Sequence, residues 1–88
     1  MTQELNLSVR DRLIAMVAQT LAKNSIDRSF SIDDPLVEVG LTSLDMVNLL
    51  FDVEAAFDVT IPLQELTTEN FETIAVIEGL MTRLLPNN

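Results

Sequence analysis

The sequence contains no histidine, cysteine, tryptophan or tyrosine. Without histidine and cysteine, the chain lacks the commonest general base, the thiol nucleophile and the usual zinc ligands. Its 88 residues suffice for one modest core, but not for a core that also encloses a deep active-site cleft. We therefore expect a single domain over residues 1–88 that is not an enzyme, with no catalytic residue and no metal site.

Basic side chains are also scarce. The chain has five Lys and Arg against 14 Asp and Glu, which gives a net charge of -9 at pH 7. This charge repels nucleic acid and anionic membranes and favours protein partners with basic surfaces. The segment Met1–Leu7 has neither a basic cluster nor a long apolar run, so we expect no signal peptide and no membrane span. A cytoplasmic monomer is the expected state.

Apolar residues recur at helical spacing in several stretches of the chain. The predicted helices run from Ser8 to about Lys23, with Asp11 in a capping box, from Leu44 to Phe57, from Leu63 to Leu66, and from Thr67 or Thr68 to about Leu84. The expected core faces are Val9, Leu13, Met16, Val17 and Thr20, flanked by Ile14 and Leu21; Met46, Leu50, Val53 and Phe57, with Leu49 at the edge; and Ile74, Ile77, Met81, Leu84 and Leu85, with Phe71 at the edge. The pattern predicts an all-α bundle of three main helices and one short one. Gly79 is expected to allow close helix packing.

A long connection from Asn24 to Thr42 separates the first two main helices. The apolar residues expected to hold it against the helices are Ile26, Phe30, Ile32, Leu36, Val37 and Val39. The sequence Asp33-Asp34-Pro35 predicts a turn that opens a short helical segment over Leu36–Glu38.

The same loop carries a rival metal site. Ligand-type side chains at the spacing of a calcium-binding EF-hand loop are Asp27, Ser29, Ser31, Asp33 and Glu38. Ile32 stands where that loop needs glycine for its sharp turn, and Pro35 is also out of pattern. The alternative that stays open is therefore not a true EF-hand but looser binding of a divalent cation by the clustered carboxylates.

Ser43 lies where the central helix begins. Thr42 or Ser43 can cap the run from Leu44 to Phe57, and Gly40 breaks the chain just upstream. Free backbone N–H groups and the helix dipole favour an anion at such an end, so a phosphate attached to Ser43 would be well placed. Because the chain has no cysteine, any thiol chemistry would have to come from a prosthetic group. The alternative is that Ser43 is only a cap.

The segment Asp33–Asp45, Asp-Asp-Pro-Leu-Val-Glu-Val-Gly-Leu-Thr-Ser-Leu-Asp, resembles the part of acyl and peptidyl carrier proteins that receives 4'-phosphopantetheine. Phe57–Pro62 is similar to the stretch that follows their second helix. In that family the serine of an Asp-Ser-Leu motif is esterified, and the matching residue here is Ser43, preceded by Thr42 in place of the aspartate. The resemblance covers nearly the whole chain and implies the four-helix carrier fold, with three main helices, one short helix and a long first loop.

The resemblance also implies a function. Ser43 would hold 4'-phosphopantetheine, whose terminal thiol carries an acyl or aminoacyl group as a thioester to partner enzymes. The implied partners are a phosphopantetheinyl transferase, an acyl- or aminoacyl-loading ligase, and downstream acyl-processing enzymes with basic docking surfaces. Thr42 can still cap the helix but removes a negative charge, which leaves open which transferase modifies the site.

The helix that begins at Ser43 is the expected docking surface. Its apolar residues Leu44, Val47 and Phe51 fall among polar ones, which indicates a partner. Acidic residues on the same helix would steer basic partners toward it. The expected partner-binding residues are Thr42, Leu44, Asp45, Val47, Asn48, Phe51, Asp52 and Glu54. If Ser43 were only a cap, the same surface would make the chain a plain interaction module.

Two features separate the chain from fatty-acid carriers, whose second helix is usually crowded with glutamates. Asn48, Ala55 and Ala56 stand where those acids are expected. The pairing of Thr42-Ser43-Leu44 with Thr68–Phe71 looks more like carriers of aminoacyl groups, including those loaded by ligases that resemble aminoacyl-tRNA synthetases. Both kinds of cargo, fatty acyl and aminoacyl, stay open at this point.

Overall fold

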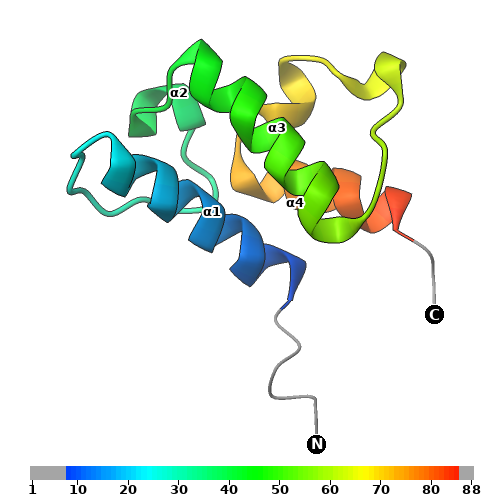
Figure 1. Ribbon diagram of the computed structural model, residues 1–88, viewed down its shortest axis with the longest axis horizontal. Helices are drawn as coiled ribbons and strands as arrows, with labels where there is room; N and C mark the ends of the chain where they lie inside the picture. The colour runs from blue at the N-terminus through cyan, green and yellow to red at the C-terminus, as the bar shows by residue number, and fades with distance from the viewer. Residues whose placement is uncertain (1–7, 86–88) are drawn as a thin grey trace, which may run out of the picture.

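A computed structural model describes residues 8–85, and every regular element in that range is helical. The elements are α1 (Val9–Lys23), α2 (Leu36–Val39), α3 (Ser43–Phe57), α4 (Ile74–Leu84) and two single turns of 3-10 helix, η2 (Leu63–Glu65) and η3 (Glu69–Phe71). The predicted all-α fold is confirmed, while the expectation about Met1–Leu7 lies outside the described residues. In Figure 1, α1 runs in the opposite direction to α3 and α4, and it contacts both of them.

Polar side chains set the starts of the long helices. The Ser8 hydroxyl accepts a hydrogen bond from the Asp11 N–H at 3.0 Å and caps α1, as the sequence predicts. The last helix begins later than predicted, because Thr73 rather than Thr67 or Thr68 caps it. Thr73 has extended backbone, with φ -136° and ψ 162°, and its hydroxyl accepts from the Val76 N–H. The residues before Thr73 form the separate turn η3, so the segment predicted as one helix consists of two elements.

The short third helix is also reduced. It is the 3-10 turn η2, which has Pro62 at its N-cap and ends at Glu65, one residue before the predicted end. The segment predicted to start after Pro35 does form a helix, α2, which extends one residue beyond the prediction to Val39. Asp58 is the C-cap of α3, and its left-handed conformation, with φ 54°, turns the chain away from the helix axis.

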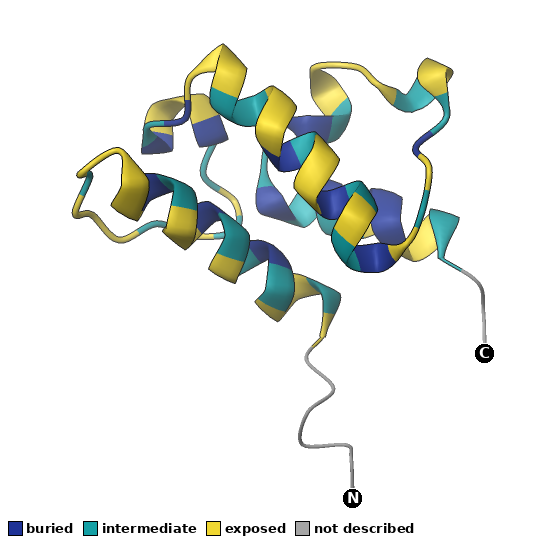
Figure 2. Cartoon of the chain, viewed as in Figure 1, coloured by how far each residue is buried: buried dark blue, intermediate teal, exposed yellow. Residues whose placement is uncertain are grey.

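One apolar core joins the three long helices, and its residues line the facing sides of the ribbons in Figure 2. The buried residues on these helices are Leu13, Val17, Leu21, Leu49, Val53, Phe57, Ile74, Ile77, Leu80 and Met81. Periodicity assigned Leu21 and Leu49 to the edges and Leu84 and Leu85 to the centre, and the structure reverses these assignments. The reason is the arrangement of neighbours: α1 packs against both α3 and α4, so burial follows the inter-helix contacts rather than the centre of each apolar stripe.

The first loop is held against the bundle by backbone hydrogen bonds and by apolar side chains. The Leu36 N–H donates to the Glu72 carbonyl at 2.8 Å, and the Ala75 N–H donates to the Ile32 carbonyl at 3.0 Å. Leu36 and Val39 are buried in the core, as expected of loop residues that anchor it. Val37 is the exception, because α2 turns its side chain outward.

Two further findings complete the fold. Gly79 does not serve close packing, because a Cβ atom built there would meet no atom within 4 Å. Among residues 8–85, no helix combines the length and the apolar character needed to cross a membrane.

Candidate cofactor attachment site

Ser43 is the first residue of α3, and its side chain is exposed. The cap is Thr42: its hydroxyl accepts from the Asp45 N–H at 3.1 Å, while an Asp45 carboxylate oxygen accepts from the Thr42 N–H at 2.9 Å. These two bonds form a complete capping box. The sequence left the cap open between the two residues, and the structure gives it to Thr42. The Ser43 hydroxyl is therefore not needed to start the helix.

The electrostatics of this helix end suit a covalently attached anion. Backbone N–H groups in the first turn of an α-helix have no acceptor within the helix, and the helix dipole adds partial positive charge there. The hydrogen bond from the Thr42 N–H is the largest cause that holds the pKa of Asp45 below its usual range, and the hydrogen bond from the Asn24 amide adds to it. Asp45 is thus held as a carboxylate that stabilises the first turn beside Ser43.

Gly40 brings the loop close to the bundle just before the site. Its φ of 133° lies in the region that favours glycine, and a Cβ atom there would lie 2.8 Å from Cδ1 of Ile26. The Gly40 N–H donates to the Leu36 carbonyl and closes α2. The next residue, Leu41, is buried in the core. This sharp, anchored turn places Thr42 and Ser43 at the surface in a defined orientation.

Ser43 lines a mostly apolar groove of about 600 Å³ between α2, α3 and the chain around η2 and η3. Among its lining residues are Val37, Met46, Val47, Leu50 and Leu66. Met46 and Leu50, which periodicity placed at the centre of the core, are only partly buried because they face this groove. An exposed hydroxyl at a helix N-terminus beside an apolar groove fits the attachment of a phosphate that bears a long organic arm.

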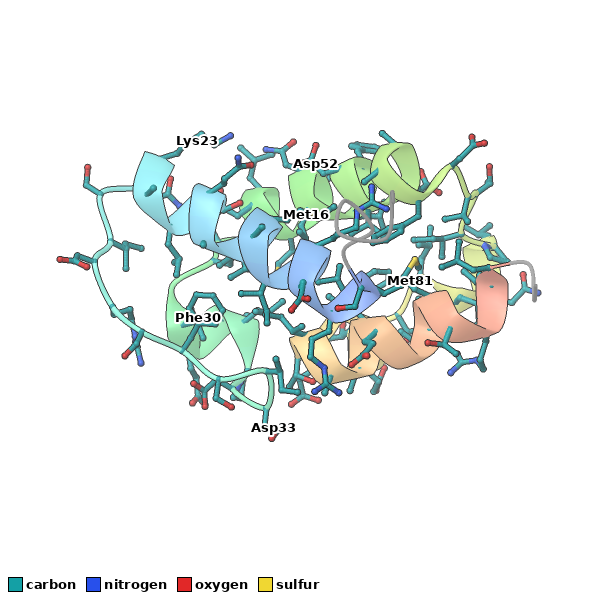
Figure 3. All side chains as sticks on the ribbon, turned by 90° about the horizontal axis from the view of Figure 1, so that it is seen from below. Met16, Lys23, Phe30, Asp33, Asp52 and Met81 are labelled. Atoms are coloured by element: carbon teal, nitrogen blue, oxygen red, sulfur yellow. The ribbon has the colours of Figure 1, made fainter. Side chains whose placement is uncertain are left out.

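The predicted apolar patch on α3 is exposed. Leu44 is 69 %, Val47 47 % and Phe51 58 % accessible, and Asn48 and Asp52 are exposed with them. Figure 3 shows Asp52 on the outer side of α3, in contrast to Met81, which lies between the helices.

Two of the three acidic residues assigned to partner steering have a role inside the chain. Asp45 belongs to the capping box, and a Glu54 carboxylate oxygen accepts from the Ile61 N–H at 2.8 Å, which ties the end of α3 to the following link. Both residues are partly buried, whereas Asp52 is exposed. Asp52 is therefore the acidic residue of the three that is most open to a partner.

Sequence reasoning missed three exposed apolar residues outside the long helices: Val37 on α2, Leu63 on η2 and Leu66 after it, at 72 %, 82 % and 39 % accessibility. They lie in short segments without a helical period, so no stripe in the sequence separates an outward from an inward position. Val37 and Leu66 line the groove together with Val47 from α3. The apolar surface around Ser43 thus extends across the groove.

The rival metal site finds no support in the part of the chain that the structure describes. Within residues 8–85, no three acidic side chains come together in a group that could hold a metal ion. The Ser31 N–H donates to Asp34 at 2.8 Å and the Ser31 hydroxyl accepts from the Asp33 N–H at 3.0 Å, so the loop uses these side chains in a local turn. Arg28 donates to the carbonyl of Glu38 and holds the end of α2 in place.

A model of the family described as "Phosphopantetheine attachment site" matches residues 11–81. The chain belongs to this family: it is a phosphopantetheine-dependent carrier protein, a class that holds cargo for enzymes without being one. The resemblance seen in the segment Asp33–Asp45 is thereby confirmed.

Two curated relatives narrow the class. Aminoacyl carrier protein 1 of Bradyrhizobium diazoefficiens is 46% identical over 85 residues, which cover 96% of this chain and 94% of that protein. Aminoacyl carrier protein 2 of the same organism is 34% identical over 79 residues, covering 90% of this chain and 89% of that one. By sequence, the chain therefore groups with aminoacyl carrier proteins.

Two solved structures share the fold. One is the crystal structure of Bradyrhizobium japonicum glycine:carrier protein ligase complexed with glycylated carrier protein; the matching chain is 45% identical, with a TM-score of 0.72, and the match covers 83% of this chain and 99% of that one. The other contains the ligase with its cognate carrier protein and an analogue of glycyl adenylate; the match has 43% identity, a TM-score of 0.74, and coverage of 86% and 99%.

Proposed function

We propose that Ser43 carries the phosphopantetheine and that the cargo is an aminoacyl group. The observation that carries the proposal is the division of labour at the start of α3: Thr42 and Asp45 make the cap, and Ser43 presents an exposed hydroxyl beside them. When attached, the phosphopantetheine supplies a thiol that binds the cargo as a thioester. The aminoacyl assignment is supported by the names of both curated relatives and by the glycylated carrier protein in the related crystal structure.

The chain's own contribution is presentation. A flexible arm raises the effective concentration of its cargo at any active site on which the domain docks. We assign docking to the exposed face of α3 formed by Leu44, Val47, Asn48, Phe51 and Asp52, for a phosphopantetheinyl transferase, a loading ligase and later acyl-processing enzymes in turn. The net charge of -9 favours partners with basic surfaces around an apolar contact.

Intact-protein mass spectrometry tests the attachment. The chain is incubated with coenzyme A, magnesium ion and a broad-specificity phosphopantetheinyl transferase, beside Ser43→Ala and, as a matched control, Ser29→Ala in the exposed part of the first loop. We expect one phosphopantetheine on the native chain and on the Ser29 variant, and none on the Ser43 variant. No gain on a folded native chain with several transferases would favour the plain interaction module instead.

A second variant addresses the transferase. Thr42→Asp keeps a side chain that can cap α3 and restores the acidic residue found in the family motif. If the missing charge limits recognition, this variant is modified faster than the native chain by transferases that serve fatty-acid carriers. Equal rates would show that Thr42 does not set transferase choice.

The cargo is tested on the modified protein. Incubation with ATP, glycine and a synthetase-like glycine:carrier protein ligase is expected to add one glycyl group, which hydroxylamine removes because it is a thioester. Fatty-acid enzymes are expected to use the protein poorly, and glutamate at the exposed Asn48 and Ala55 is expected to improve that use; Ala56, the third position expected from the sequence, packs against the core and stays unchanged. Efficient fatty acylation of the native chain without any aminoacylation would contradict the aminoacyl assignment.

A further inference from the structure

The end of α1 reaches the start of α3 through one side chain. The Asn24 amide nitrogen donates to Oδ2 of Asp45 at 2.9 Å, and the same oxygen accepts from the Thr42 N–H at 2.9 Å. Asn24 is 21 residues away from Asp45 in the sequence. No helical period or local motif predicts this bond, and the sequence assigned Asn24 only to the beginning of a loop.

Asn24 is well supported at its own end. Its backbone N–H bonds to the carbonyls of Thr20 and Leu21, each at 3.1 Å, so the residue is fixed to the last turn of α1. Its φ of -92° and ψ of 9° are those of the third residue of a type I turn, which most residue types can occupy, so an alanine could adopt the same backbone conformation. The side chain is therefore not needed to end α1, and its visible contact is the one with Asp45.

The contact bears on Ser43 through the capping box. Asp45 uses one oxygen to hold the Thr42 N–H, and its own N–H is held by the Thr42 hydroxyl. Fixing Oδ2 from the side of α1 restricts the Asp45 side chain to the position that closes the box. Because Ser43 lies between the two residues of the box, its backbone and the direction of its Cα–Cβ bond are fixed with it. The hydrogen bond from Asn24 also contributes to the lowered pKa of Asp45, in keeping with a carboxylate as the acceptor.

We infer that Asn24 is a positioning residue for phosphopantetheine attachment, which it assists by holding Asp45 in the capping box and thereby the first turn of α3 in the conformation that a transferase accepts. The inference rests on the proposed attachment at Ser43. Without Asn24, the first turn opens part of the time, and the enzyme binds only the fraction of molecules in which it is closed. The apparent affinity then falls by that fraction, while turnover of the bound complex is unchanged.

Steady-state kinetics of phosphopantetheine transfer, with coenzyme A and a transferase shown to modify the native chain, test the inference. Asn24→Ala is expected to raise KM for the carrier by up to about fivefold with kcat unchanged, because the loss of one exposed hydrogen bond shifts the closing equilibrium of the first turn by at most about that factor. The control is Ile77→Val, a core change outside the lining of the groove beside Ser43, which lowers stability but leaves a folded majority and so leaves KM unchanged. A KM for Asn24→Ala equal to that of the native chain would overturn the inference.

A double-mutant cycle shows whether Asn24 acts through Asp45. In an Asp45→Ala background, where the capping box is already broken, Asn24→Ala is expected to have no further effect on KM. An effect on KM that persists at the same size in that background would refute the proposed route, because it would mean that Asn24 acts on the transferase directly.

Amide hydrogen exchange gives a readout that does not depend on modification. Asn24→Ala is expected to speed exchange at the Thr42 and Asp45 N–H groups. Amides in the middle of α4 are expected to exchange only as fast as the global stability of the variant allows. Unchanged exchange at Thr42 and Asp45 would contradict the inference even if no transferase modified the native chain. A native chain that accepts no phosphopantetheine, with faster exchange in the variant, would instead count against the attachment at Ser43 and leave the positioning of the helix end supported.

Discussion

The two glycines of the chain are expected to respond to the same substitution with opposite signs. Gly40 has a φ of 133°, and a Cβ atom there would lie 2.8 Å from Cδ1 of Ile26, whereas a Cβ atom at Gly79 would meet nothing within 4 Å. Holding alanine in a sparsely populated backbone region costs about 1–3 kcal/mol. The contact is with the far end of a flexible side chain, so it adds little once Ile26 shifts. We expect Gly40→Ala to lower the free energy of unfolding by about 2 kcal/mol.

Gly79→Ala is the matched control, since it makes the same chemical change at an exposed position inside α4. Alanine is favoured over glycine there by about 0.5–1 kcal/mol, because it loses less backbone entropy on folding. For a domain of this size, 1 kcal/mol corresponds to a change in Tm of about 4–8 °C. Gly40→Ala should therefore lower Tm by about 12 °C, and Gly79→Ala should raise it by about 4 °C.

Urea denaturation followed by far-ultraviolet circular dichroism measures both changes, since the chain has no tryptophan or tyrosine for fluorescence. The slope of the unfolding free energy with urea should stay constant, which would show that only stability has changed. If Gly40→Ala were neutral or stabilising like Gly79→Ala, the argument from the backbone conformation of Gly40 would be wrong. If Gly79→Ala were destabilising, the conclusion that there is open space around a Cβ atom at Gly79 would be wrong.

Three other substitutions or conditions have expected outcomes. Thr42→Ala should lower the free energy of unfolding by about 1 kcal/mol in urea denaturation, and Thr42→Ser, which keeps the capping hydroxyl, should cost much less; equal losses would show that the hydroxyl does not matter. Arg12 donates to the Ala56 carbonyl at 2.7 Å and lies 4.4 Å from the centre of the Phe57 ring, so Arg12→Leu should cost about 1–2 kcal/mol in the same assay, and an unchanged midpoint would deny the link between α1 and α3. The pKa of Asp45 is lowered from 3.8 on folding, so its stabilising effect is complete above that pH and is lost as the pH falls through the lower folded-state value; Asp45→Asn should remove this part of the acid sensitivity, and an identical pH profile would contradict it.

The sequence located the start of α3 at Thr42 and Ser43 through interactions between near neighbours. A capping residue acts on an N–H three positions later, and an apolar residue at a polar position of a helix is visible within two turns. For this reason Ser8, Ser43 and the patch at Leu44, Val47 and Phe51 could be assigned before the fold was known. The apolar residues that hold the first loop were also found, with the exception of Val37.

The tertiary structure decided what depends on segments far apart in the chain. Periodicity identifies an apolar stripe but does not show which neighbours cover it. The packing of the other helices against α3 buries Leu49 in the core and leaves Leu50 in the groove beside Ser43. The chain forms the separate turn η3 before α4, so α4 begins only after its cap, Thr73. The sequence offers several threonines as possible caps and does not show which of them is used. The hydrogen bond from Asn24 to Asp45 exists only because the end of α1 lies beside the start of α3. Local hydrogen bonds join residues only a few positions apart and can be predicted from the sequence, whereas the contacts that complete the site arise from the packing of whole helices.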